Sequence, residues 1–258
     1  MKKFYFVALM TLMALTASAQ QALQLSTYAG TNLQKYDGQE CKVTVTRYLF
    51  HGWNTFSLPF ALSEDEMNEA FGSDCRLERL VGVESVGKDM VLNFQDCKAQ
   101  GMEANVPYIL WYNGENANKR IAKLALISDA PATVSFSDKG TTVTMACAQK
   151  QFDGKGCYGV LAKDNAEAKF TKVDETITSG FFATRCYIRV ENGNPMNLLT
   201  NHLAAGEATG IDAISVAGKS VDVYNLSGQK VATKANKATL RSLAPGVYVI
   251  NGQKVLVK

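Results

Sequence analysis

The sequence predicts an all-β protein: a β-sandwich body with one short helix, followed by a small C-terminal β-sandwich-like domain. Short β-branched or aromatic runs with period-2 alternation recur along the chain. Turn residues separate these runs at spacings typical of sandwiches, as at Asp153-Gly154. Only residues 63–71 have the capping and apolar pattern of a helix. Together these features favour packed sheets over a helical or α/β fold.

The first 19 residues have the three parts of a secretory signal peptide. Two lysines at positions 2 and 3 precede an apolar run over residues 4–15, and Ala17-Ser18-Ala19 forms a small-residue cleavage site before Gln20. The apolar run is shorter than the ~20 residues that a membrane helix needs. We therefore expect export by the Sec translocon, cleavage by signal peptidase between Ala19 and Gln20, and no transmembrane segment in the mature chain.

Residues 20–202 are expected to form the β-rich body, as one large or two small β-sandwich modules. A first strand is predicted at 41–48, and the capping box at Ser63 and Glu66 starts the helix, which Gly72 ends. Later strands are predicted at 106–112, 121–127, 132–136, 141–145, 157–161, 168–173 and 184–190.

Aromatic residues on the strand over 106–112 are the candidate ligand-binding residues. Alternation places Tyr108, Leu110 and Tyr112 on one face and Ile109 and Trp111 on the other. Since both faces carry aromatics, one face is expected to be partly exposed. Exposed Trp or Tyr side chains stack sugars in carbohydrate-binding β-sandwiches, so Trp111 and Tyr112 are candidates for that role. Trp53 is expected in the core, and a ligand groove lined by Trp53 is the alternative.

Six cysteines lie beyond the signal peptide, and an even number in an exported chain permits three disulfides. Cys147 and Cys157 form the best local candidate pair, because a turn-rich segment lies between them. The alternative is that the cysteines are small buried residues. Their spacing contains no zinc pattern, so no metal site is predicted.

The chain contains no sequence motif of a known catalytic site or cofactor site: GxSxG, HExxH, a P-loop and GxGxxG after a strand are all absent. We therefore predict no catalytic residues, no cofactor and a non-enzymatic protein. A hydrolase is the less favoured alternative, because paired carboxylates across a cleft cannot be located from sequence.

The tail has the pattern of two hairpins in series. Val221 and Val223 begin a strand that turns at Ser227-Gly228, and residues 247–250 precede the Asn251-Gly252 turn. The small-residue segment 203–210 is expected to be a linker, which leaves 211–258 as a separate domain.

The runs VYNLSGQKV (223–231) and PGVYVINGQKVLVK (245–258) resemble the C-terminal sorting domain of the type IX secretion system, found in secreted Bacteroidetes proteins. The resemblance implies a small β-sandwich recognised by an outer-membrane translocon. The residues that carry it are Tyr224, Gly228, Pro245, Gly246, Val247, Tyr248 and Lys258.

The body has a second resemblance. The segments GWNTFSLPFAL (52–62), GMEANVPYILWYNG (101–114) and GFFATRCYI (180–188) look like a β-rich module of secreted and surface proteins from Bacteroides and Prevotella. That module implies no activity.

Charge limits the classes of partner. The 27 basic residues nearly balance the 24 acidic ones and form no dense cluster, so a nucleic-acid partner is not expected. From Ile211 onward seven basic residues face two acidic ones, which would suit lipopolysaccharide or another anionic surface. We expect an exported protein of the cell surface or medium, with the periplasm as fallback. Its body would be a structural or adhesive module or, alternatively, a glycan-binding one.

Overall fold

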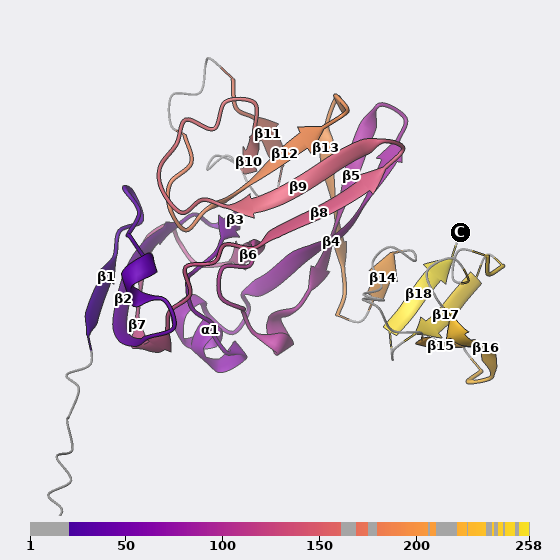
Figure 1. The fold of residues 1–258 in the computed structure, drawn as a ribbon, viewed down its shortest axis with the longest axis horizontal. Coiled ribbons are helices and arrows are strands. Elements are labelled where there is room, and N and C mark those ends of the chain that lie inside the picture. Colours follow the sequence, from indigo (N-terminus) through magenta and orange to yellow (C-terminus); the bar gives the residue numbers. More distant parts are fainter. Residues whose placement is uncertain are drawn as a thin grey trace, which may run out of the picture.

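The protein is built almost entirely of strands (Figure 1). The computed structural model describes residues 21–160, 169–174, 180–205, 207–209, 221–225, 227–235, 239, 242–244, 246–250 and 253–257. The body contains β1 (Ala22–Leu25), η1 (Gln34–Tyr36), β2 (Glu40–Leu49), β3 (Gly52–Phe56), α1 (Glu64–Phe71), β4 (Arg76–Val86), β5 (Asp89–Asp96), η2 (Lys98–Gln100), β6 (Tyr108–Tyr112), β7 (Ala117–Leu126), β8 (Thr133–Asp138), β9 (Thr141–Cys147), β10 (Tyr158–Val160), β11 (Phe170–Lys172), β12 (Cys186–Glu191) and β13 (Leu198–Leu203). The C-terminal part contains β14 (Glu207–Thr209), β15 (Val221–Asn225), β16 (Lys230–Ala235), β17 (Gly246–Ile250) and β18 (Gln253–Val257). The predicted all-β class is confirmed.

Ten strands of the body form one sheet, in the order β3-β6-β4-β5-β13-β11-β10-β12-β9-β8. The sheet curls on itself, because β8 at one edge contacts β4, while β10 and β12 contact β3 at the other edge. The Ser85 N–H on β4 donates to the Asp138 carboxylate at the end of β8 over 2.7 Å. A bulge between Leu80 and Gly82 shifts the register of β4 against β5, and bulges bend strands. The layers of this part of the body therefore arise from one curled sheet.

A second, three-stranded sheet packs outside the curl, in the order β1-β2-β7. Strand β2 alternates between buried and outward residues, and Cys41, Val43 and Val45 are buried. This is the pattern of a strand with one face on a core. Helix α1 contacts β7. The small sheet and the helix thus cover the outer face of β3, β4 and β6.

The body has two main hydrophobic cores, one on each face of β6. Tyr108, Leu110 and Tyr112 belong to the outer core with residues of the small sheet and α1. Ile109 lies in the core enclosed by the curl, and Trp111 packs against it. The predicted division of this strand into two faces is confirmed.

Helix α1 begins as the sequence predicts. The Glu66 N–H donates to the Ser63 hydroxyl over 3.2 Å, and the Ser63 N–H donates to the Glu66 carboxylate over 2.8 Å. Both bonds satisfy N–H groups that the first turn leaves without helical partners. Gly72 ends the helix with a φ of 99°, a left-handed value that favours glycine.

The C-terminal strands form a five-stranded sheet of their own, in the order β14-β18-β17-β15-β16. Its small core contains Val221, Val223, Ala235 and Ile250. Gly228 has a φ of 80° in the turn between β15 and β16, as the hairpin requires. The Asn251-Gly252 turn lies outside the described residues. Part of the expected linker forms β14, which pairs in parallel with β18.

Among the described residues, no helix is long and apolar enough to cross a membrane.

Candidate functional site

A groove of about 880 Å³ opens beside the two tryptophans of the chain. Its walls come from strands that lie far apart in the sequence. The lining residues are Trp53, Arg76, Trp111, Lys169, Phe170, Asn197, Leu198, Leu199, Thr200 and His202. Because aromatic and apolar walls carry a few charged and polar groups here, the groove has the composition of a small-molecule site. We call it the tryptophan groove.

Strand register brings the aromatic wall together. Trp53 on β3 lies directly opposite Trp111 on β6, and Trp111 lies directly opposite Arg76 on β4. Directly opposed residues share one face of a sheet and touch. The two indole rings meet edge to face, with 5.5 Å between centroids. Trp53 is buried, whereas Trp111 is half-buried and presents part of its ring to the groove.

A fully buried carboxylate holds two polar side chains of the groove. Glu78 lies two residues after Arg76 on β4 and therefore projects on the same face. Its carboxylate accepts a hydrogen bond from Nη2 of Arg76 and pairs over 2.6 Å with Nδ1 of His202. An ionised carboxylate only accepts, so His202 then carries its proton on Nδ1 and leaves Nε2 as the second polar atom of the ring. Burial of Glu78 behind these partners fixes both side chains.

The Trp53 ring contacts both of these polar side chains. The His202 ring stacks on the Trp53 ring at 4.6 Å with 12° between the planes. The Arg76 guanidinium lies 5.2 Å from the Trp53 ring, within the range of a cation–π contact. The other histidine of the chain, His51, meets Trp111 edge to face at 5.7 Å. Both histidines and both tryptophans therefore gather at one site.

The groove is equipped for binding more clearly than for hydrolysis. Glycoside hydrolysis uses two carboxyl groups across the scissile bond. None of the described residues that line the groove is acidic, and Glu78 lies behind Arg76 and His202. Within the described part of the chain, no cluster of three or more His, Cys, Asp or Glu could hold a metal.

The predicted aromatic pair separates in the structure. Trp111 lines the groove, but Tyr112 points to the opposite face and is only 4% exposed in the outer core. Lys119 Nζ lies 4.9 Å from the Tyr112 ring. Adjacent strand residues face opposite sides, so Tyr112 cannot stack the same ligand as Trp111. Trp53, expected in the core, is buried and also lines the groove.

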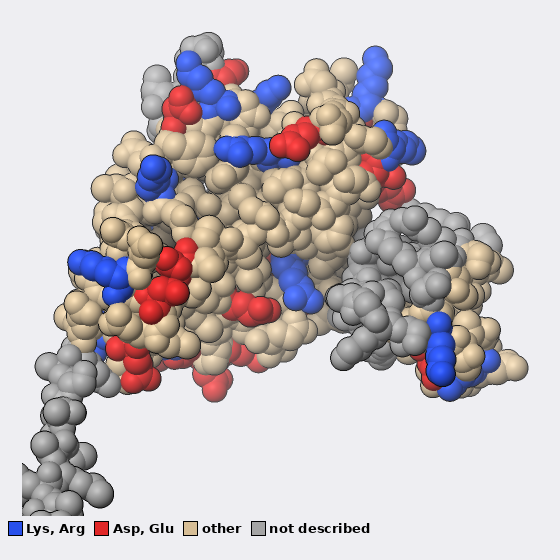
Figure 2. Space-filling view, viewed as in Figure 1, with Lys and Arg blue, Asp and Glu red and all other residues tan. Residues whose placement is uncertain are grey.

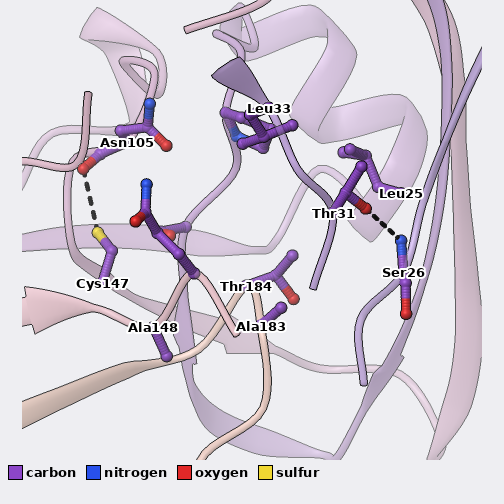
Figure 3. Close-up of a pocket in the computed structure, with 12 residues that line it drawn as sticks. Leu25, Ser26, Thr31, Leu33, Asn105, Cys147, Ala148, Ala183 and Thr184 are labelled. Atoms are coloured by element: carbon purple, nitrogen blue, oxygen red, sulfur yellow. Dashed lines mark hydrogen bonds between the residues drawn. The ribbon is translucent and has the colours of Figure 1, made fainter. Parts of the chain in front are cut away.

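The predicted disulfide between Cys147 and Cys157 is absent, and all six cysteines are free and buried. Cys147 belongs to the core inside the curl, whereas Cys157 lies in a separate small cluster with Val173 and Phe181. Cys147 donates instead to the Asn105 carbonyl over 3.0 Å, beside the small cavity of Figure 3. That cavity offers about 30 Å³, against about 880 Å³ for the tryptophan groove, so the groove is the better candidate for a ligand site.

The described residues of the predicted sorting motif lie in the C-terminal sheet. Tyr224 lies on β15, and Lys230 Nζ is 5.4 Å from its ring. Tyr248 on β17 packs against the small core, and its hydroxyl donates to the Ala244 carbonyl over 2.9 Å. Gly246 and Val247 precede it on β17. The remaining residues of the prediction, Pro245 and Lys258, and the cleavage-site residues Ala19 and Gln20, lie outside the described residues.

Charged side chains of both signs are intermixed on the face of the body that Figure 2 shows.

Sequence reasoning missed Arg76 and Glu78 as site residues. The spacing of Arg76 and Glu78 was a usable signal, because residues two apart on a strand share a face.

A scan against protein-family models and searches of curated proteins and of solved structures found no match to this chain. Its function is therefore inferred from its own residues.

Proposed function

We propose that the protein is an exported, non-enzymatic binding protein of the cell surface or medium, whose body binds carbohydrate in the tryptophan groove. The observation that carries the proposal is the half-buried Trp111 ring beside Arg76 and His202. The apolar face of a sugar ring stacks on an indole, while its hydroxyls need hydrogen-bonding groups at the edge. Arg76 and His202 supply such groups. Because Glu78 already holds both side chains in place, ligand binding loses less side-chain conformational entropy.

Two further features support binding over catalysis. The groove has no acidic residue among its described lining, so it offers no pair of carboxylates for glycoside hydrolysis. Two of its polar side chains, Arg76 and His202, are held by Glu78, which favours a rigid recognition surface. A purely structural or adhesive module is the alternative, and such a role would not require Trp111.

The test is glycan-array binding by the purified protein, followed by calorimetry with the best glycan. Trp111→Ala should weaken binding about fivefold or more, taking as the scale the roughly 1–3 kcal/mol that a nucleic-acid base loses when its aromatic stacking partner is removed. Leu126→Ala is the matched control, since Leu126 is an exposed apolar residue outside the groove. The proposal is wrong if the wild-type protein binds no glycan, or if Trp111→Ala binds as tightly as wild type.

We also propose that the C-terminal unit is a sorting signal for outer-membrane export. Its support is that β14 to β18 form a sheet with their own small core, as a separable unit should. Deleting residues 211–258 and fractionating the host cells tests this role. Loss of the truncated protein from the surface and medium is the expected result. Wild-type levels there would show that the tail is not the signal.

A further inference from the structure

A second cavity, of about 500 Å³, lies away from the tryptophan groove and shares no lining residue with it. It is bounded by the segment after β1, by β2, and by the residues just before β12. Two arginines, Arg47 and Arg185, line it together with the aromatic residues Tyr28, Tyr48, Phe50 and Phe182. We call it the arginine cavity.

Arg47 is a buried charge that has no acidic partner among the described residues. Its side chain is on β2, and the residue is only 3% exposed. The Nη1 group donates to the Tyr48 carbonyl over 3.1 Å and the Nη2 group to the Thr55 carbonyl over 3.3 Å. These bonds fix the plane of the guanidinium. The Nε atom is shielded from solvent and has no hydrogen-bond partner.

Arg185, which also lines the cavity, resembles Arg47 in having an unpartnered Nε atom. Its Nε is also buried without a partner, and its guanidinium lies 5.9 Å from the Phe182 ring. The described residues contain four buried side-chain polar atoms without a partner, and two of them are these Nε atoms. Such atoms are rare in proteins, and both belong to arginines that line one cavity, which is therefore the candidate place for an acceptor of these guanidinium groups.

The charges of the cavity indicate the sign of that acceptor. None of the described residues that line it is acidic. Buried charges are normally paired, because an isolated one is costly. Burial lowers the pKa of Arg47 well below its usual value, and the neighbouring Arg185 lowers it further. Burial also lowers the pKa of Arg185. Two like charges without a counter-charge would both be stabilised by one anion.

We propose that the arginine cavity binds the carboxylate of a small organic acid with a flat apolar body. The guanidinium groups of Arg47 and Arg185, which line the cavity, would donate to the carboxylate oxygens, since a guanidinium offers parallel donors that match this group. The flat body would pack on Tyr28 and Phe182, whose rings meet edge to face at 5.0 Å. Tyr28 is 69% exposed, so this wall is open to an entering ligand.

Calorimetry on the purified protein tests the site with benzoate as the probe. Benzamide has the same shape without the charge, and sulfate has charge without the flat body. Benzoate should bind and raise the melting temperature, with weaker affinity at higher salt, whereas benzamide and sulfate should bind at least tenfold more weakly. Equal binding of benzamide, tighter binding of sulfate, or no binding of benzoate overturns the proposal.

Variants of Arg185 locate the effect. Arg185→Gln should weaken benzoate binding about tenfold or more, and Arg185→Lys should restore only part of it, because lysine lacks the fork of donors. Arg189→Gln is the matched control, since this exposed arginine lies on β12 and does not line the cavity. If Arg47→Gln folds, its benzoate affinity should also be weaker than that of the wild-type protein. Unchanged benzoate affinity in Arg185→Gln would contradict the site even where Arg47→Gln fails to fold.

Discussion

Cys147 on β9 lies directly opposite Cys186 on β12, and the two thiols are not bonded to each other covalently. Cys186 donates to the Phe56 carbonyl over 3.2 Å, and Cys147 to the Asn105 carbonyl over 3.0 Å. The neighbouring Cys186 thiol lowers the pKa of Cys147, whereas burial raises that of Cys186. Cys147 is therefore the first of the pair to become a thiolate, the reactive form.

Oxidation should join Cys147 to Cys186. Directly opposed residues of antiparallel strands have Cα atoms about 4.5–5.5 Å apart, inside the range that disulfides accept. Mild treatment of the reduced protein with diamide, followed by peptide mapping, should recover this cross-link. Cys157→Ser should leave it unchanged, because Cys157 lies in another cluster. A bridge between Cys147 and Cys157 would contradict the structure.

Removing the Ser63 hydroxyl should destabilise the protein by about 1 kcal/mol, the usual effect of losing an N-cap. Ser63→Ala frees the Glu66 N–H of α1, and the midpoint of urea unfolding measures the loss. Ser73→Ala is the control, since Ser73 is exposed just after the helix. Equal midpoints for the two variants would mean that the capping box contributes nothing.

Glu78 and His202 should show a strong energetic coupling. Either His202→Gln or Glu78→Gln removes a charge-assisted bond to a buried group and should cost about 1.5–3 kcal/mol of unfolding free energy. The double variant should cost less than the sum, because the second change removes a bond already lost. His51→Gln should be nearly neutral, as His51 is exposed. Additive losses would exclude the interaction.

The folded protein should lose stability as the pH rises through about 8.5, where an unfolded cysteine is half ionised. Burial raises the pKa of Cys97 to about 12 and that of Tyr108 to about 12. Between the unfolded and folded values, the unfolded state binds fewer protons, so stability falls with pH. Urea midpoints between pH 8 and pH 11 measure the fall.

Tyr108→Phe should make this fall shallower above about pH 10, because phenylalanine cannot ionise. The Glu103 N–H donates to the Tyr108 hydroxyl over 3.1 Å, so the variant should also be less stable at neutral pH. An identical pH dependence with and without Tyr108 would show that its phenol does not contribute.

Strands with one face toward solvent were predictable from sequence. In β2, outward and buried residues alternate, and the prediction at 41–48 matches the strand within two residues. Strand β4 was not predicted, because it is covered on both faces and lacks this alternation. Leu77 packs in the outer core and Leu80 in the core within the curl, so both faces are apolar. A strand buried on both sides loses the alternation that identifies strands.

The tryptophan groove was predictable only in part. Local alternation assigned Trp111 and Tyr112 to opposite faces, but it could not show which face would be covered. Glu78 and His202 lie 124 residues apart and meet because the sheet curls. Arg47 and Arg185 likewise come from distant segments. Contacts of this kind depend on the closure of the whole sheet, which no local pattern encodes.

Strand β13 joins the two halves of the ten-stranded sheet, since it lies between β5 and β11. It pairs in parallel with β5, and Asn201 bonds to Asn93, 108 residues earlier. The sheet therefore cannot close until the chain has been synthesised as far as Leu203. A pairing over such a distance folds slowly. The body should thus stay incompletely folded during most of its synthesis, which exposes its unpaired strands to aggregation.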